Sequence, residues 1–200
     1  MIILSDFIQH LPLSPAIVGD LQPWEITGNL SEFILKLIPN LDSQYTINDG
    51  VAVHHTAIIE SGAVIKAPAI INGNCFVGSY AYLRGGVFLD ESVRVGPGCE
   101  IKASIICKGS TIAHFNFIGD SIIGNHVNFE AGSIIANHYN ERANKRIFVI
   151  FNSKIIDSGV EKFGALVGDN SQIGANAVLS PGTILQPGSI VKRLGLVEQT

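Results

Sequence analysis

The chain has 200 residues, of which 46% are hydrophobic and 15% are charged, and its formal net charge is −4. This composition excludes a disordered chain and is sufficient for one domain with a continuous core. Lysines and arginines are scattered within an acidic total, which excludes the electrostatic footprint of a nucleic-acid-binding protein.

Residues 1–45 form the first predicted unit, an N-terminal cap of loops and one helix. They lack a basic leader, and no apolar run approaches the roughly eighteen residues that span a bilayer, so we expect a cytoplasmic protein without a membrane partner. Apolar residues recur at helical spacing at Leu30, Phe33, Ile34, Leu37 and Ile38. They predict a short helix with Asn29 or Ser31 as its N-cap, ending before Pro39. We expect this helix to cap the open first coil of the next unit.

A six-residue repeat predicts the fold of residues 46–195. Small or aliphatic residues occupy every sixth position in Val51, Ala57, Ala63, Ala69, Cys75, Ala81, Val87, Val93, Cys99, Ile105 and Thr111. A second series begins two residues later, at Val53. A period of six is typical of a parallel β-helix, in which three short strands make one coil of about eighteen residues. We therefore predict an all-β hexapeptide-repeat solenoid of about seven coils.

Stacking of the coils predicts which residues are neighbours. Residues eighteen apart should lie about 4.8 Å apart, the spacing of paired strands. Cys75 and Cys99 fall on an inward position and are predicted to be buried, unpaired thiols. Glycines such as Gly96 follow an inward aliphatic residue, where we expect a sharp bend with positive φ.

Residues 138–163 interrupt the repeat. The segments RIFVIF and KIID flank Asn152 and Ser153 like the arms of a β-hairpin at 146–157. The hairpin carries the apolar row Ile147, Val149 and Phe151. Such a row needs a partner surface, which we expect a neighbouring subunit to provide.

Arg84 and Lys102 are eighteen residues apart, so they should project from the same part of consecutive coils. Two like charges roughly 5 Å apart are unfavourable unless an anion or a carboxylate lies between them. Two interpretations follow. Either Glu100, Asp90 or Glu91 neutralises the pair, or the pair binds an anionic ligand.

Three histidines, His114, His126 and His138, are spaced by twelve residues. Stacking requires eighteen, so within one chain these histidines lie on different edges, and we expect no metal site. The sequence also has no GxSxG elbow and no glycine-rich phosphate loop opening a helix.

The segment AHFNFIGDSIIGNHVNFEAGSIIAN, from Ala113, resembles a hexapeptide-repeat acyltransferase. It is similar to the C-terminal acetyltransferase domain of the bifunctional UDP-N-acetylglucosamine diphosphorylase/glucosamine-1-phosphate N-acetyltransferases. The later segment KFGALVGDNSQIGANAVLSPGTIL resembles the archaeal-type enzymes of that family. The resemblance covers residues 80–193. It implies a left-handed parallel β-helix, a homotrimer, and acetyl-CoA-dependent N-acetylation of a glucosamine 1-phosphate-like acceptor without a metal, as in UDP-N-acetylglucosamine biosynthesis.

The resemblance also implies roles for individual residues. The family's catalytic histidine corresponds to His114. Substrate-binding positions correspond to Arg84, Lys102, Phe117, Asn128, Asn137 and Lys145, or Arg146 in place of Lys145 if the insertion is aligned differently. Positions that contact the acetyl donor correspond to Ala175, Lys192 and Arg193. Phe117 departs from the family, which usually has tyrosine there, and the departure leaves the acceptor sugar open.

The implied chemistry is direct acetyl transfer. The amine of the sugar loses a proton as it attacks the thioester, and His114 is the expected general base. Backbone N–H groups at the coil turns are suited to stabilise the developing oxyanion. Two alternatives stay open: a trimeric scaffold or regulatory partner of a separate nucleotidyltransferase, and an acyltransferase with another amino-sugar or amine acceptor. Residues 1–45 are too few for a nucleotide-binding sheet and no LxxGxGxR start occurs, so we do not expect uridylyl transfer by this chain alone.

Overall fold

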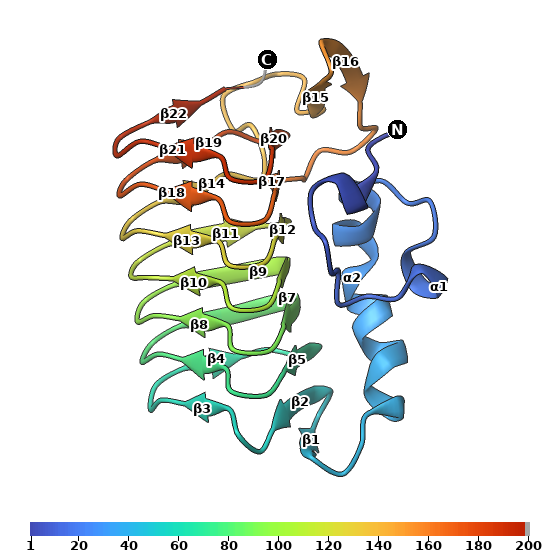
Figure 1. The fold of residues 1–200 in the computed structure, drawn as a ribbon, viewed down its shortest axis with the longest axis vertical. Helices are drawn as coiled ribbons and strands as arrows, with labels where there is room; N and C mark the ends of the chain where they lie inside the picture. The colour runs from blue at the N-terminus through green and yellow to red at the C-terminus, as the bar shows by residue number, and fades with distance from the viewer. Residues whose placement is uncertain (199–200) are drawn as a thin grey trace.

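The computed structural model describes residues 1–198, which form a parallel β-helix with a helical N-terminal segment along one side (Figure 1). The predicted fold class is therefore confirmed. Each coil contributes one strand segment to each of three faces. The second face is a sheet of seven strands, one from each of seven coils.

The strands of the three faces are as follows. Face 1 contains β2 (Val51–His54), β5 (Ala69–Ile71), the second halves of β7 (Tyr82–Leu89) and β9 (Glu100–Ile106), β12 (Ile122–Ile123), β17 (Ala165–Val167) and β20 (Thr183–Leu185). Face 2 contains β3 (Ile58–Ile59), β6 (Phe76–Val77), β8 (Arg94–Val95), β10 (Thr111–Ile112), β13 (Asn128–Phe129), β18 (Gln172–Ile173) and β21 (Ile190–Val191). Face 3 contains β4 (Val64–Ile65), the first halves of β7 and β9, β11 (Phe117–Gly119), β14 (Ile134–Ile135), β19 (Val178–Leu179) and β22 (Leu196–Val197). A further strand, β1 (Tyr45–Asn48), pairs antiparallel with β2.

The coils are not all eighteen residues long. Arg84 pairs with Lys102 eighteen residues later, but Val87 pairs with Ser104 only seventeen residues later. The corner between them is shorter because Ala103, with φ of 46°, replaces the pair Gly85 and Gly86. From the sequence, the spacing of six is expected to hold to about residue 113 and to slip between Ile118 and Ile123, which are five apart. The structure has that slip, with both residues in the core, but it also has this earlier one, where one lost residue exchanges the inward and outward positions that follow. Ile105, which the repeat places inside, faces outward instead.

The N-terminal segment contains η1 (Leu4–Asp6), α1 (Pro15–Val18), α2 (Pro23–Leu37) and η2 (Ile38–Asn40). The predicted N-cap at Asn29 or Ser31 is wrong. Helix α2 begins at Pro23 because Gln22 and Glu25 form a capping box, in which each side chain bonds the other's backbone N–H.

Helix α2 covers face 1 lengthwise rather than the open first coil (Figure 1), so the expected capping position is also wrong. The reason is an apolar column on the outside of face 1. Its buried or half-buried members are Ala52, Ile70, Phe88, Ile105, Ile122, Leu166 and Ile184. Trp24, Leu30 and Ile34 of α2 belong to the same cluster, so the helix removes this column from water.

The insertion contains the predicted hairpin, β15 (Phe148–Phe151) paired antiparallel with β16 (Lys154–Asp157). Asn152 and Ser153 both have positive φ, which matches the twist of a two-residue hairpin turn. The expectation of a neighbouring subunit for its apolar row is wrong. Ile147 and Val149 are buried within the chain, and the ring of Phe151 lies 5.8 Å from the ring of Phe7.

The interior of the coils is a continuous aliphatic core that includes Cys75 and Cys99. Both are buried and unpaired, as predicted, and burial raises the pKa of the Cys75 thiol to about 12. The predicted reason for Gly96 is wrong. Its φ is not positive; instead a Cβ there would lie 1.5 Å from the carbonyl oxygen of Ala113 in the next coil. Within residues 1–198, no helix is both long and apolar enough to cross a membrane.

Candidate functional site

One column of turns joins face 2 to face 3, and we call it the histidine corner after His114. The backbone N–H of Gly132 donates to the carbonyl of His114, and the N–H of Asn176 donates to the carbonyl of Ala131. These bonds stack His114, Ala131 and Ala175 in successive coils. His114 and Ala175 are thus two coils apart, or about 10 Å. The structure therefore brings the predicted base and a predicted donor contact to the same corner.

The side chain of His114 is exposed. It makes no hydrogen bond or ion pair with any residue of the described chain, 1–198, so its ring is accessible to a ligand. Its neighbour Phe115 is 73% exposed and has a left-handed backbone with φ of 53°. Tyr80 and Leu194 share this conformation and this exposure at the same corner. The corner therefore presents His114 within a column of exposed apolar side chains.

A cavity of about 400 Å³ lies on face 2 beside the histidine corner. Its lining includes three residues predicted from the sequence, Asn128, Lys192 and Arg193. Asn128 begins β13 and is exposed, and it pairs with Thr111 and Gln172 in the neighbouring coils. The cavity and the corner together form a continuous candidate site for a donor that runs along face 2.

Glu130 occupies the boundary between this cavity and the corner, and the sequence did not indicate it. Its carboxylate accepts two bonds from the Arg193 guanidinium, at 2.7 and 2.8 Å, and one from the N–H of Ala175 at 2.9 Å. The Arg193 bonds, and secondarily the Ala175 N–H, lower the pKa of Glu130 to about 2. Two of the three predicted donor contacts, Ala175 and Arg193, are thus engaged by one carboxylate. Lys192 has no ion-pair partner among the described residues.

A second column of turns joins face 3 to face 1, and we call it the lysine corner after Lys102. Arg84 and Lys102 are in register, as predicted. Arg84 pairs with Glu100 at 2.7 Å, and Lys102 pairs with Asp120 at 2.5 Å. Of the two interpretations, the structure shows in-chain carboxylates neutralising both cations.

The identity of these carboxylates was predicted only in part. Glu100 was one of the three carboxylates named for the pair of cations, but Asp120 was missed. Asp90 and Glu91 lie at the corner between faces 1 and 2, where Glu91 pairs with Lys108 at 2.7 Å. They are not partners of the two cations.

The remaining predicted substrate residues divide between the lysine corner and the insertion. Asn137 donates its side-chain amide to Asp120. A Cβ placed on Gly119 would lie 2.9 Å from the Phe117 ring and 2.9 Å from the Asn137 amide carbon, so both side chains flank this glycine. Lys145 is exposed in the loop before β15, and Arg146 pairs with Asp157.

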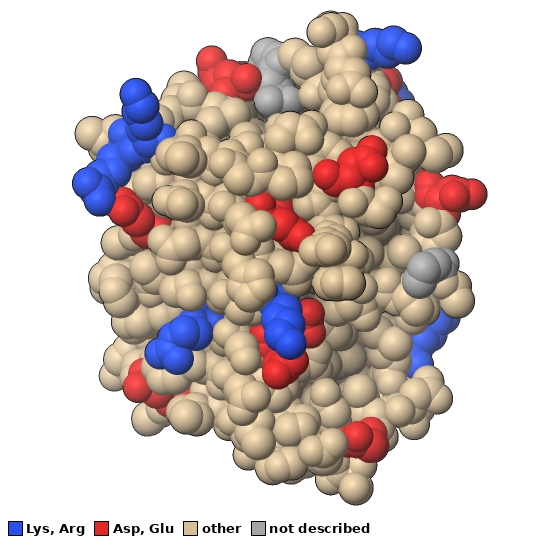
Figure 2. Space-filling view, viewed as in Figure 1, with Lys and Arg blue, Asp and Glu red and all other residues tan. Residues whose placement is uncertain are grey.

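The predicted site residues thus form two groups at different corners of one chain. His114, Asn128, Ala175, Lys192 and Arg193 lie at or beside the histidine corner. Arg84, Lys102, Phe117 and Asn137 lie at or beside the lysine corner. Figure 2 shows blue and red residues next to one another on the face viewed there, rather than a patch of one sign. Asn128 is the one predicted acceptor residue that one chain brings to the side of the predicted base, while Arg84, Lys102, Phe117 and Asn137 lie at the other corner.

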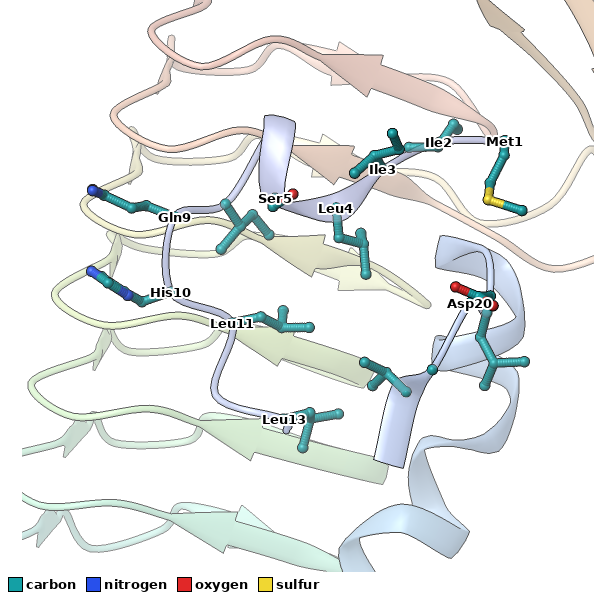
Figure 3. A pocket seen from close by; sticks show the side chains of 14 residues that line it. Met1, Ile2, Ile3, Leu4, Ser5, Gln9, His10, Leu11, Leu13 and Asp20 are labelled. Carbon is teal, nitrogen blue, oxygen red and sulfur yellow. The ribbon is translucent and has the colours of Figure 1, made fainter. Parts of the chain in front are cut away.

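A larger cavity of about 460 Å³ lies within the N-terminal segment. Figure 3 shows the chain from Met1 to Leu13 as a curve with Asp20 on the opposite side, and aliphatic side chains such as Leu4 and Leu11 along it. None of the sequence-predicted site residues lines this cavity, so it is not the candidate catalytic site. Residues 1–198 contain no cluster of three or more histidine, cysteine or carboxylate side chains suited to a metal ion.

Comparison with known proteins decides the family. A family model described as the GMPPB C-terminal domain matches residues 47–156, which is more than half of the chain. The chain belongs to the GMPPB C-terminal domain family. This member is 36% identical over 182 residues to the bifunctional protein GlmU of Methanocaldococcus jannaschii, covering 84% of this chain and 43% of that protein. It is 34% identical over 159 residues to the same-named protein of Methanococcus vannielii, covering 74% of this chain and 36% of that protein.

A third relative is the bifunctional sugar-1-phosphate nucleotidylyltransferase/acetyltransferase of Sulfurisphaera tokodaii, 35% identical over 64% of this chain and 32% of that protein. This family member therefore spans less than half the length of these relatives. The resemblance read from the sequence is confirmed. Among solved structures, a hexapeptide transferase family protein from Anaplasma phagocytophilum matches 76% of this chain and 81% of its own, with 18% identity and a TM-score of 0.39. A TM-score this low supports no argument about this chain.

Proposed function

We propose that this chain is an acetyl-CoA-dependent N-acetyltransferase of the hexapeptide-repeat type, acting on an amino-sugar phosphate such as glucosamine 1-phosphate. The observation that carries the proposal is the histidine corner. An exposed His114 lies there in one column with Ala175, beside a cavity lined by Asn128, Lys192 and Arg193. The proposal assigns to this chain the acetyltransferase activity that the name of the Sulfurisphaera tokodaii relative includes. It also places that activity in the cytoplasm.

In the proposed reaction, the pantetheine arm of the donor lies along face 2 and its thioester lies at the histidine corner. His114 accepts the proton that the sugar amine loses as its nitrogen attacks the thioester carbon. The coenzyme thiolate then leaves as the carbonyl re-forms. No covalent enzyme intermediate and no metal ion is needed in this sequence of steps.

The acceptor would bind near the lysine corner, where Arg84 and Lys102 are in register. Their carboxylate partners make the resting cluster electrically balanced. A sugar phosphate would therefore bind to the donors of the two cations that Glu100 and Asp120 leave free, because an ammonium has three N–H donors and a guanidinium has five. Charge-assisted bonds to a phosphate are worth about 1.5–3 kcal/mol each.

The two groups of residues would serve one site if two copies of the chain met, and we propose a homotrimer in which each site lies between subunits. The exposed side chains of Tyr80, Phe115 and Leu194 support a contact at the histidine corner. Light scattering should return about three times the chain mass of 21.4 kDa. A stable monomer at micromolar concentration would refute the trimer.

Mixed trimers test the shared site directly. We expect His114→Ala protein and Lys102→Ala protein each to lose most of the activity alone, and their mixture, after subunit exchange, to recover part of it. Subunits that carry both substitutions are the matched control and should restore nothing. No recovery in mixtures that demonstrably exchange would contradict a site shared between copies.

Incubation with acetyl-CoA and glucosamine 1-phosphate, followed by mass spectrometry of the sugar, tests the activity. We expect an N-acetylated sugar phosphate to form and His114→Ala protein to form none. A chain that acetylates no amino sugar would instead favour a trimeric scaffold for a separate nucleotidyltransferase.

A further inference from the structure

The carboxylate of Asp120 is the centre of a hydrogen-bonded chain of four side chains at the lysine corner. It accepts Nζ of Lys102 at 2.5 Å and Nδ2 of Asn137, both on the same oxygen, Oδ2. The side chain of Asp120 is 10% exposed and that of Lys102 is 16% exposed. A largely buried carboxylate is costly unless it is paired and hydrogen-bonded, so these two bonds are expected to persist.

The orientation of the Asn137 amide follows from the charge of Asp120. A carboxylate can only accept, so the amide must turn its NH₂ group toward Asp120. Its oxygen, Oδ1, then lies 3.2 Å from Nδ1 of His138. An amide oxygen can only accept a hydrogen bond, so Nδ1 of His138 must carry the proton.

This arrangement selects one tautomer of the neutral imidazole of His138. With the proton on Nδ1, the lone pair lies on Nε2. His138 is exposed at the same corner as Lys102 and Asn137, and it makes no second hydrogen bond within residues 1–198. Its Nε2 is thus a fixed acceptor beside two residues of the proposed acceptor pocket.

We propose that Asp120 is a positioning residue that holds Lys102 and Asn137, and that His138 contributes its Nε2 to the binding of the acceptor. The group bound would be a hydroxyl or ammonium of an amino sugar, both of which donate hydrogen bonds. The proposal rests on the proposed function for the identity of the acceptor, but the tautomer of His138 does not depend on it.

The tautomer is measured by long-range ¹H–¹⁵N correlation of the histidine rings in the ¹⁵N-labelled protein. We expect His138 to show a protonated Nδ1 and an unprotonated Nε2 at a pH where the ring is neutral. In Asn137→Ala protein, the two tautomers should become mixed. An Nε2–H tautomer in the parent protein would overturn the proposal.

Titration with glucosamine 1-phosphate should shift the ring signals of His138 and leave those of His126 unchanged. His126 is the matched control because it is exposed at the corner between faces 1 and 2. An unchanged His138 spectrum at saturating sugar would overturn the binding role.

Two substitutions distinguish the contribution of Nδ1 of His138 from that of Nε2. His138→Asn retains a donor near Nδ1 but has nothing at Nε2, whereas the amide of His138→Gln reaches the place of Nε2. We expect the acceptor KM to rise roughly tenfold in His138→Asn, with partial recovery in His138→Gln and no change in the acetyl-CoA KM. His126→Asn, which suits its positive φ, should be silent. An unchanged acceptor KM in His138→Asn would overturn the proposal.

The positioning role of Asp120 has its own readout. Asp120→Asn keeps the shape but removes the charge that pairs with Lys102, so we expect a raised acceptor KM with little change in the acetyl-CoA KM. Equal changes in both constants would indicate a structural role only. If no variant or parent protein transfers acetyl groups, the proposed function fails, while the tautomer experiment still decides whether Asp120 and Asn137 orient His138.

Discussion

His114 and Ala175 lie in the same corner column of the β-helix, although the hairpin insertion separates them in the sequence. The column is continuous because β14 pairs directly with β19 across the insertion, with Ile134 opposite Val178. The insertion therefore leaves the stacking of the coils intact and lets residues before and after it contribute to one site.

Replacement of His114 by alanine should abolish acetyl transfer without loss of stability. The side chain is exposed, so its removal leaves no cavity, whereas loss of a general base typically lowers turnover by about 10²- to 10⁴-fold. Turnover and thermal unfolding of the same preparation check both parts. Near-normal turnover, or a protein that does not fold, would show that the assignment is wrong.

Replacement of Lys102 by alanine should have two effects. Acceptor kcat/KM should fall roughly 10- to 150-fold, because a charge-assisted bond is worth about 1.5–3 kcal/mol. The variant should also be less stable by about 3 kcal/mol, because the carboxylate of Asp120 is left largely buried and unpaired. Lys108→Ala is the control. Its ion pair with Glu91 is exposed, and neither activity nor stability should change measurably.

Replacement of Phe117 by tyrosine should improve the use of glucosamine 1-phosphate. Phe117 flanks Gly119 together with Asn137, so a hydroxyl on its ring would be added beside the proposed acceptor residues. The ratio of kcat/KM for glucosamine 1-phosphate to that for other amino sugars should rise. A ratio that falls would indicate that Phe117 is suited to a different acceptor.

Glu130 should make stability depend on pH in a defined range. Its pKa is lowered from 4.5 to about 2 in the folded chain by Arg193 and by the N–H of Ala175. A lowered folded-state pKa contributes stability that is fully present above the ordinary pKa and is lost as the pH falls toward the folded value. The difference in urea midpoint between the parent and Glu130→Gln should therefore be constant above about pH 5 and shrink between 4.5 and about 2. A difference that grows in acid would contradict this pairing.

Two glycine substitutions separate the effect of close packing from that of helix propensity. Gly96→Ala should cost at least about 3 kcal/mol, because the added Cβ would overlap the carbonyl of Ala113 in the next coil. Gly28→Ala lies within α2 with no atom near its Cβ, so it should stabilise the chain by ~0.5–1 kcal/mol. Urea titrations measure both. Equal effects would indicate that the coil spacing at Gly96 is not as tight as described.

The architecture of the coils could be predicted because small or aliphatic residues recur at every sixth position in each coil. The slip between Ile118 and Ile123 could also be predicted from their spacing, but the earlier one could not, because its short corner at Ala103 is made by an ordinary residue in a left-handed conformation. The docking of α2 on face 1 was missed for a related reason. After the earlier slip, the six-residue repeat assigns Ile105 to the interior, although it faces outward. The apolar column that α2 covers was therefore hidden in the sequence.

The candidate site could be predicted only in part from the sequence. The register of Arg84 with Lys102 was predicted correctly, and so was Glu100 as a neutralising carboxylate, but Asp120 was not. Asp120 lies eighteen residues after Lys102, so the eighteen-residue rule connects the two and could have found this partner, although the strand register pairs Lys102 with Gly119. Glu130 and Arg193 are brought together across the insertion, where spacing in the sequence carries no information about stacking.

The rate of thiol release from acetyl-CoA, with glucosamine 1-phosphate and unphosphorylated glucosamine compared in parallel, tests the central claim most directly. We predict sustained release that depends on the amino sugar, a much higher kcat/KM for the phosphorylated sugar, and loss of release in His114→Ala protein. Release at equal rates with both sugars would contradict the phosphate-binding role of the lysine corner. No release with any amino-sugar phosphate would contradict the proposed activity itself.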